Sequence, residues 1–400
     1  MNILNKLPGL ILKGFALLLL SAGLLSTITG VSPIYDFADP KPFAGKDIFN
    51  PYRNLDTTCC WKRANFHTHT MVEGIFNECH HTPQEVWDSL ERFGYDIVTF
   101  SNHNELTVHP FDKDLQVNVY EHGYNIFKYH KLVFGADKVI HFDNLFPIFD
   151  SQWQFQMDYL GEGSDFIQLN HPFRTIGVNP RKMKRLTGYR IMELDSGMTT
   201  EQEYWDWALS AGHYSFGLAN DDLHYPDRSY CIAVRCNFLC TPSGKYEDIK
   251  KTLLDGCYYS MRVPDYGGGD WKIKHEGNRN LPEIKDIGLK DTTIYLSLSQ
   301  VADSIKVTGQ NGIKLALSHR TANLEYAFRP EDRYARITAY FPGGEVIYTN
   351  PFARYDSSVS HSPYVEFPHP INIILTIIYN FTLLLLMALF VMAIVKILKK

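Results

Sequence analysis

The sequence predicts an α/β domain followed by a small all-β module, with an apolar segment at each end of the chain. Between Trp61 and Pro264, short apolar runs alternate with helical patterns, as they do in α/β folds. Beyond residue 285, six short segments of alternating character are separated by turn residues, which is typical of antiparallel β structure. The two ends differ from both parts because they are almost free of charge.

The first 30 residues are expected to form a signal peptide or a signal anchor. The stretch from Phe15 to Gly30 is apolar and rich in small residues, and Lys6 and Lys13 precede it. The sequence "STITGVSP" is a poor cleavage site, which favours a retained anchor. Residues 31–60 contain four prolines and are interpreted as a linker into the domain.

The predicted α/β domain spans residues 61–264. Its first helix is indicated by "TPQEVWDSLERFG", in which Thr82, Pro83 and Glu85 form a capping box and Gly94 ends the helix. Strand-like runs recur as "YDIVTFS", "SDFIQLN", "YRIMELD" and "YSFGLAN", and Gly256 closes another helix. This alternation fits either an open sheet or a barrel.

The sequence pattern changes after "DYGGGDW", from alternating strands and helices to short strand-like segments. Residues 265–285 are predicted to form a hinge, and residues 286–360 a compact β-sandwich-like module. Residues 371–396 follow as a predicted transmembrane helix, because residues 371–395 contain no charged side chain and are long enough to span a bilayer. Lysines flank the outer end of both apolar segments, so both termini are expected in the cytoplasm and the middle of the chain outside it, periplasmic or at the cell surface.

Composition excludes some classes of function. The formal net charge of -5 gives no overall basic surface, which argues against a dedicated nucleic-acid-binding protein. The seven cysteines include no C-x2-C pair of a structural zinc module. Free buried thiols are the favoured interpretation, although an oxidising compartment would permit disulfides.

Side chains of the kinds that bind metals recur where predicted strands end. Twelve of the 16 histidines lie between residues 67 and 224. His67 and His69 follow a short apolar run and, two positions apart, share one face of an extended chain. The other candidates in this region are Glu73, His103, Glu121, His130, His171, Glu193, Asp222 and His224. An α/β enzyme assembles its site from such strand exits.

This set of side chains predicts a cluster of divalent cations. Imidazole mixed with carboxylate suits Zn²⁺, Mn²⁺ or Fe²⁺ and does not suit an all-oxygen calcium site. The set contains more ligands than one tetrahedral ion can use. We therefore expect two or three ions, with at least one carboxylate bridging.

The motifs "FHTHT", "SNHNE", "YEHGYN", "LNHP" and "NDDLH" resemble, in order, those of the PHP (polymerase and histidinol phosphatase) superfamily. That resemblance covers residues 61–264 and implies a distorted (β/α)7 barrel that holds up to three metals. The stretches "KTLLDGCYYS" and "YARITAYFPGGEVIYTNPF" resemble the carbaryl-hydrolase-type (CehA/McbA) branch, in which a small β-sandwich follows the barrel.

The resemblance also implies roles for individual residues. The first ion would be held by His67, His69, Glu121 and Asp222. Glu121 would bridge to a second ion, which His130 and His171 complete. A third would be held by His103 and His224, with Glu73 as an additional ligand. Asn102 departs from the family pattern, because an aspartate often precedes the histidine there.

The predicted function is that of a membrane-anchored metal-dependent hydrolase of a small-molecule substrate, with a phosphoester as the favoured substrate. A water held between two cations would become a hydroxide nucleophile. Besides the bridging Glu121, Asp222 or Glu193 would move the proton, although Glu193 could equally orient a ligand. Arg174 is a candidate for an anionic group of the substrate. The alternatives are a carbamate or amide hydrolase with the same centre, and a metal-stabilised surface binding protein without catalysis.

Overall fold

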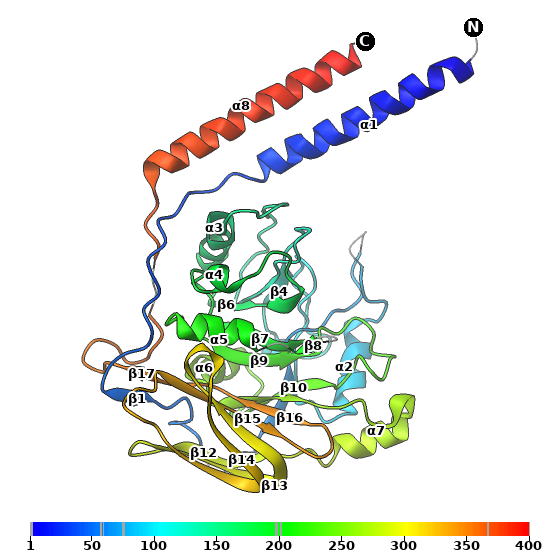
Figure 1. Cartoon of the computed structure of the whole chain (residues 1–400). Coiled ribbons are helices and arrows are strands. Elements are labelled where there is room, and N and C mark those ends of the chain that lie inside the picture. The colour runs from blue at the N-terminus through cyan, green and yellow to red at the C-terminus, as the bar shows by residue number, and fades with distance from the viewer. Residues whose placement is uncertain are drawn as a thin grey trace.

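The computed structural model describes residues 3–56, 58, 60–73, 77–196, 199–200, 202–365 and 368–399. Two sheets form the body of the protein (Figure 1). The smaller sheet comprises β4 (Val119–His122), β5 (Lys131–Phe134), β6 (Phe166–Leu169), β7 (Ile191–Ser196), β8 (Thr199–Thr200) and β9 (Phe216–Asn220). The larger sheet begins with β1 (Asp47–Phe49), β2 (Lys62–Asn65), β3 (Ile97–Val98), β10 (Arg235–Leu239) and β11 (Tyr258–Arg262).

The larger sheet continues into the C-terminal part of the chain. It takes in β12 (Ile284–Lys290), β13 (Thr293–Thr308), β14 (Lys314–Ala327), β15 (Tyr334–Tyr340), β16 (Val346–Thr349) and β17 (Phe352–Tyr355). The helices are α1 (Ile3–Ile28), α2 (Pro83–Glu91), α3 (Asp150–Gly161), α4 (Pro180–Met183), α5 (Glu203–Ser210), α6 (Tyr246–Asp255), α7 (Trp271–Asn278) and α8 (Ile373–Leu398).

The predicted α/β class is confirmed. The distorted (β/α)7 barrel that the resemblance implied is not seen in the described residues, because both sheets are mixed. Strands β6, β7 and β9 pair in parallel, as do β2 and β3. In contrast, β4–β5 and β5–β6 are antiparallel, and β10 is antiparallel to both of its neighbours. A short connection without a helix joins β4 to β5, and such a connection allows only antiparallel pairing.

Strands on either side of the predicted hinge pair with one another. Strand β16 lies antiparallel to β11, with Tyr259 opposite Thr349. Strands β13 and β14 form a long antiparallel pair at the edge of this sheet (Figure 1). Helix α7 lies within the segment predicted as a hinge. The β-rich character of residues 286–360 is therefore seen, and the positions of the domain boundaries remain predictions.

The residues predicted from the sequence to cap helices α2 and α6 make the expected structures. The Thr82 hydroxyl accepts a hydrogen bond from the Glu85 backbone N–H at 3.3 Å, and the Glu85 carboxylate accepts one from the Thr82 N–H at 2.8 Å. This capping box satisfies donors that the first helical turn leaves free. Helix α6 ends at Gly256, whose φ of 85° favours glycine. A Cβ there would also lie 2.3 Å from the Phe216 ring.

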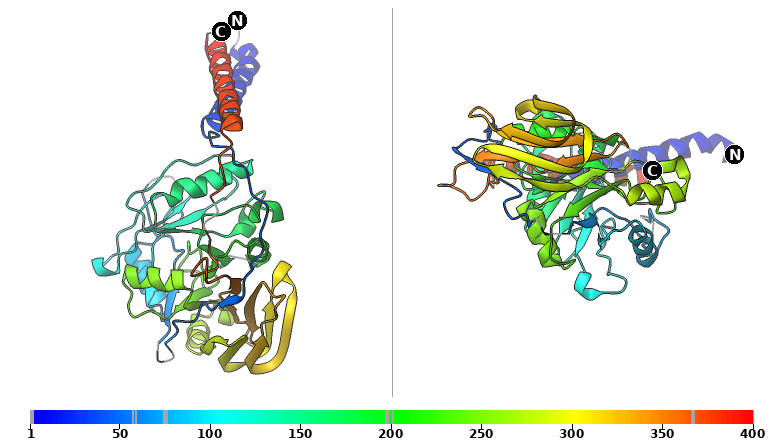
Figure 2. Two further views of the ribbon diagram at one scale, coloured as in Figure 1. Left: turned by 90° about the vertical axis from the view of Figure 1, so that its left-hand side faces the viewer. Right: turned by 90° about the horizontal axis from the view of Figure 1, so that it is seen from below.

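The two terminal helices lie side by side, apart from the two sheets (Figures 1 and 2). Helix α8 and residues Gly9–Ile28 of α1 are each long and apolar enough to cross a membrane. The segments that join them to the domain also run together, because the Asn372 N–H donates to the Ile34 carbonyl at 2.8 Å. The first residues of α1 and the last residues of α8 therefore lie at the same end of this helix pair (Figure 1).

The expectation of free buried thiols is confirmed for three cysteines and wrong for Cys240; Cys231 is half-buried and Cys60 exposed, and Cys59 lies outside the described residues. Cys79, Cys236 and Cys257 are buried and free. Cys240, however, is disulfide-bonded. The sequence spacing carried no signal for this bond, because disulfide pairing depends on which segments the fold brings together.

A buried ion pair ties α5 to β15 and should be important for stability. The Arg336 Nε donates to Asp206 Oδ1 at 2.8 Å, and the Tyr334 hydroxyl donates to the same oxygen at 2.9 Å. Both charged side chains are almost fully buried. Replacing Asp206 by Asn leaves Arg336 without its counter-charge, so we expect the free energy of unfolding to fall by about 3 kcal/mol.

The matched control for Asp206→Asn is Asp114→Asn. Asp114 pairs with Lys245 at 3.3 Å, and both side chains are exposed, so its loss should cost less than about 1 kcal/mol. Thermal unfolding of the full chain in detergent compares the two variants. Equal shifts of the unfolding midpoint would contradict a special role for the Asp206 pair.

Candidate metal centre

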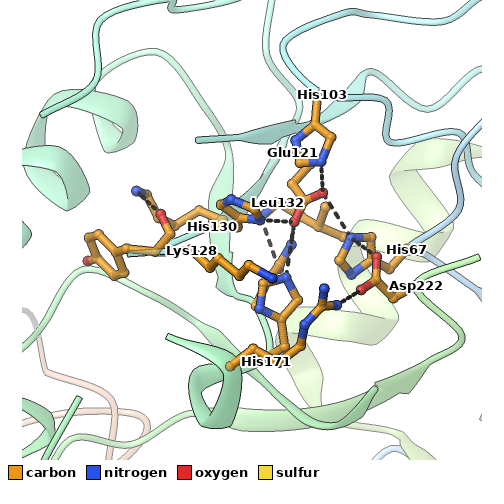
Figure 3. A network of polar contacts seen from close by, with 12 residues as sticks. His67, His103, Glu121, Lys128, His130, Leu132, His171 and Asp222 are labelled. Carbon is orange, nitrogen blue, oxygen red and sulfur yellow. Dashed lines mark hydrogen bonds and ion pairs between the residues drawn. The ribbon is translucent and has the colours of Figure 1, made fainter. Parts of the chain in front are cut away.

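The predicted ligand residues gather at one place from several strands (Figure 3). His67 and His69 follow β2, Glu121 lies in β4, His171 follows β6, and Asp222 follows β9. His171 and Asp222 have φ angles of 23° and 50°, a region that non-glycine residues rarely occupy. Strained backbone of this kind clusters at functional sites, where the surrounding structure enforces it.

Four buried side chains form the first group of donor atoms. His67 Nε2 lies 3.2 Å from Glu121 Oε2 and 3.1 Å from Asp222 Oδ1. His69 Nε2 lies 3.3 Å and 3.4 Å from the same two oxygens. Ligand atoms about 2.0–2.1 Å from a tetrahedral ion lie about 3.3 Å from one another. The spacing of these four atoms therefore fits a cation between them.

Hydrogen bonding gives an independent test of that fit. The Nε2 atoms of His67 and His69 are buried, and neither makes a hydrogen bond with the described residues. A buried nitrogen without a partner is costly. Both nitrogens face carboxylate oxygens at short distance without donating to them, so the four atoms converge on a common point. That convergence is what cation ligands require.

Glu121 joins the first group to a second one. Its Oε1 lies 3.1 Å from His130 Nδ1 and 3.3 Å from His171 Nε2, while its Oε2 lies 3.3 Å from His103 Nε2. The Asn170 amide donates to Oε1 at 3.0 Å and fixes the carboxylate plane. Because each oxygen faces a different set of imidazoles, Glu121 has the geometry of a bridging carboxylate.

A third group is completed by a residue that the sequence did not predict. Glu78 Oε2 lies 3.3 Å from His103 Nε2 and 3.5 Å from His224 Nδ1. His224 Nε2 is in turn 3.3 Å from Asp222 Oδ1. The predicted Glu73 is exposed, and no contact between it and the cluster is present among the described residues. Glu78 lies in an irregular segment, where neither strand nor helix period marks a residue as inward-facing.

Glu78 and Glu73 make a matched pair for mutation. We expect Glu78→Gln to weaken binding of one ion at least about tenfold, because it removes a carboxylate that faces two imidazoles. Glu73→Gln should leave all ions bound. Titration of the chelator-treated full chain with Mn²⁺, followed by calorimetry, measures both. If Glu73→Gln lost more Mn²⁺ affinity than Glu78→Gln, then Glu73 and not Glu78 would be the ligand.

Glu193 lies behind the cluster. Its Oε1 is 3.0 Å from His67 Nδ1, and its Oε2 accepts the His171 backbone N–H at 2.9 Å. The Asn220 amide also donates to Glu193 at 3.1 Å. Glu193 is fully buried and contacts the His67 nitrogen that faces away from the cluster. This arrangement favours a role in orienting His67 over a role in proton transfer.

The cluster concentrates opposite charges in a buried space. Burial disfavours a charged His67, but Asp222, Glu121 and Glu193 outweigh burial and hold the pKa of His67 well above its ordinary value. Burial also disfavours a charged Glu121, yet the surrounding imidazoles keep its pKa well below the ordinary value. Burial lowers the pKa of His130 to about 4. Without a cation, a proton on His67 neutralises part of the negative charge of the surrounding carboxylates.

This electrostatic pattern predicts how pH affects the chelator-treated protein. The raised pKa of His67 means that its ion pairs stabilise the fold below about pH 6.5 and are lost as the pH rises through the raised value. A bound cation replaces that proton, so the metal-loaded protein should lack this alkaline weakening. Unfolding midpoints at about pH 6 and about pH 9, with and without Mn²⁺, test it. Parallel pH curves for the two forms would contradict it.

Two cationic side chains lie at the rim of the cluster. The Arg174 guanidinium donates to Asp222 Oδ2, and about a third of the Arg174 side chain, 35%, is exposed. Lys128 is exposed and extends towards His171 (Figure 3). The two loops are joined, because the Thr175 hydroxyl donates to the Lys128 carbonyl at 2.9 Å. Arg174 was predicted from sequence, whereas nothing in the sequence singled out Lys128.

Comparisons with known proteins assign no family to this chain. No protein-family model and no curated protein matches it. Among solved structures, it is similar to a two-domain protein from Bacteroides vulgatus ATCC 8482 described as containing a predicted PHP-like metal-dependent phosphoesterase. The sequences are 14% identical, and the match covers 79% of this chain and 100% of the other, with a TM-score of 0.38. A TM-score this low does not establish a shared fold.

Proposed function

We propose that the protein is a membrane-anchored, metal-dependent hydrolase of phosphoesters. The observation that carries the proposal is Glu121, whose two oxygens each face a separate set of imidazoles at 3.1–3.3 Å. A carboxylate in this position suits a centre of at least two divalent cations, such as Zn²⁺, Mn²⁺ or Fe²⁺. The donor set is larger than the four ligands of a closed structural site, which favours catalysis over a structural role.

The residues that would hold the cations are those of the three groups. His67, His69, Glu121 and Asp222 would hold the first ion, and Glu121, His130 and His171 the second. His103, His224 and Glu78 supply donors for a third. When bound, divalent cations activate water as a nucleophile and polarise the oxygen of the group under attack.

The chain's own residues supply orientation, charge and a proton acceptor. Glu193 fixes the His67 ring through Nδ1, and Asn170 fixes Glu121. Asp222 faces the cluster through Oδ1, and its Oδ2 accepts the Arg174 guanidinium at the rim. Asp222 would relay a proton from the attacking water to the leaving group once Arg174 turns to the substrate. Arg174 and Lys128 would orient an anionic substrate from the rim.

Those rim cations favour a phosphoester over a carbamate or amide. Guanidinium and ammonium groups bind phosphate oxygens strongly, whereas a neutral carbonyl substrate gains little from them. The carbamate or amide hydrolase remains the second candidate, since the metal centre would serve both reactions. A binding protein without catalysis is the third candidate. A structural metal site would not explain the additional, exposed donor Glu78.

Membrane anchoring and an extracytoplasmic location are part of the proposal. Helices α1 and α8 have the length and apolar character required, and Lys396 and Lys399 at the end of α8 favour a cytoplasmic terminus. The disulfide at Cys240 suits an oxidising compartment outside the cytoplasm. Cysteine labelling of intact cells at exposed positions of the domain tests this orientation.

We also propose membership of the PHP superfamily, in or near its CehA/McbA-type branch. The order of the motifs along the chain supports this membership. The gathering of the motif residues in one cluster supports it as well. Strands β12 to β17 follow the α/β part, as the β-sandwich does in that branch.

A substrate panel tests the proposed reaction. The full chain, loaded with Mn²⁺ or Zn²⁺, is assayed with p-nitrophenyl phosphate, a phosphodiester analogue and an aryl carbamate. We expect a phosphoester to be cleaved and the carbamate to be cleaved poorly. Lys128→Gln should raise KM for the phosphoester about tenfold, whereas Lys113→Gln, on an exposed turn, should not. Carbamate cleavage without phosphoester cleavage would overturn the proposal.

A further inference from the structure

The loops that carry His130 and His171 form one unit. The Ile176 backbone N–H donates to the Phe127 carbonyl at 2.7 Å, and the Arg174 N–H donates to the His171 carbonyl at 2.8 Å. A third segment joins them, because the Ile126 N–H donates to the Leu145 carbonyl at 3.3 Å. The segment that begins at Leu145 leads directly into α3.

Apolar side chains are exposed along this unit. The exposed fractions are 51% for Ile126, 61% for Ile148, 52% for Phe149 and 56% for Ile176. We call these four residues and the half-buried Phe127 the apolar strip. A soluble enzyme with a soluble substrate gains nothing from exposing large apolar groups beside its site, and such patches mark membrane or partner contacts.

The apolar strip is continuous with the transmembrane helices. The Phe149 ring lies edge-on to the Tyr379 ring of α8, with 5.9 Å between centroids. The Tyr379 hydroxyl donates to the Gly30 carbonyl at 2.9 Å, and the Gln152 amide of α3 donates to the same carbonyl at 3.1 Å. Helix α3 accordingly lies on the side of the domain nearest α1 and α8 (Figures 1 and 2).

Basic side chains accompany the strip. A cavity of about 580 Å³ is lined by Ile34, Phe127, Ile148 and Phe149 together with Arg181, Lys182 and Arg185. Arg181 and Arg185 pair with Asp150 at 3.4 Å and 2.9 Å, and this one carboxylate neutralises only part of their charge. Apolar groups flanked by cations match the surface of a bilayer with anionic head groups.

We propose that the substrate is an amphiphilic phosphoester that stays in the bilayer surface while it reacts. Its apolar chain lies along the apolar strip, and its phosphoryl group reaches Arg174, Lys128 and the cluster at the other end. In the reaction, the oxygen of water bonds to phosphorus as the bond from phosphorus to the leaving oxygen breaks and leaves its electron pair on that oxygen. The proton that the water gives up passes by way of Asp222 to the leaving oxygen. This inference rests on the proposed phosphoesterase function.

Two chromogenic diesters that differ only in chain length test the inference. The full chain is reconstituted in phosphatidylcholine vesicles with Mn²⁺ and given p-nitrophenyl hexadecyl phosphate or p-nitrophenyl ethyl phosphate. We expect kcat/KM to be at least about tenfold higher for the hexadecyl ester. In Ile126→Ser/Ile176→Ser, the ratio of the two kcat/KM values should fall about tenfold.

The control is Ile313→Ser, which alters an equally exposed isoleucine, 55%, directly before β14 and far along the chain from the strip. It should leave the ratio unchanged. If the ethyl ester is cleaved and kcat/KM for the hexadecyl ester is equal or lower, the proposal of an amphiphilic substrate is wrong, while the proposed phosphoesterase function still stands. Failure to cleave either ester, or any phosphoester of the panel, would overturn the proposed function as well.

Discussion

Replacement of Glu121 by Gln is expected to lower phosphoester hydrolysis at least about a thousandfold. The amide cannot present two anionic oxygens, so the two groups of imidazoles lose the carboxylate that faces both. The negative charge that offsets two cations is lost as well. Steady-state kinetics of the Mn²⁺-loaded full chain measures the effect, and calorimetric titration should show loss of at least one ion.

A matched variant separates this loss from general damage. Glu91 lies exposed at the end of α2, so Glu91→Gln should retain full activity and all ions. Circular dichroism should show the same helix content in both variants. If Glu121→Gln kept more than about a tenth of the activity with a normal fold, the assignment of Glu121 as the bridging residue would be wrong.

Removal of divalent cations should lower the thermal unfolding midpoint by about 10 °C. Two imidazoles and two carboxylates are packed together in a buried place, where they could hold a cation. A ligand that binds only the folded state at a thousand times its Kd contributes about 4 kcal/mol. For a large domain, this corresponds to a shift of several degrees for each bound ion. Scanning calorimetry before and after chelation measures it.

Re-addition of Mn²⁺ should restore the midpoint of the wild-type chain. The Glu121→Gln variant serves as the control, because it should respond to the chelator much less. An unchanged midpoint in the wild-type chain after complete chelation would show that the cluster is held together by its own ion pairs. In that case the protonated His67 would be the native form.

The sequence revealed the centre of the cluster because its residues adjoin buried strands. His67, Glu121, His171 and Asp222 each lie in or shortly after an apolar run, and these runs are strands of both sheets whose ends meet at one place. The terminal helices were equally predictable, since a charge-free apolar run of bilayer length is typical of a membrane-spanning helix. In both cases a local pattern of the sequence marks the residues concerned.

Other features depend on tertiary structure and left no local signal. Glu78 reaches His103 and His224 from an irregular segment, and Glu73, five residues earlier, has the same chemistry without the contact. Lys128 reaches the rim because its loop pairs with the loop after His171. The expected distorted (β/α)7 barrel is not seen in the described residues, because the chain between β4 and β5 has no helix and β5 runs antiparallel to β4.

The central claim is that Glu121 lies between bound divalent cations. Anomalous diffraction from crystals of the full chain grown with Mn²⁺ or Zn²⁺ tests it most directly. We expect at least two anomalous peaks, one beside His67, His69 and Asp222 and another beside His130 and His171, with Glu121 reaching both. Crystals that contain the metal but show no anomalous peak at these side chains would contradict the account.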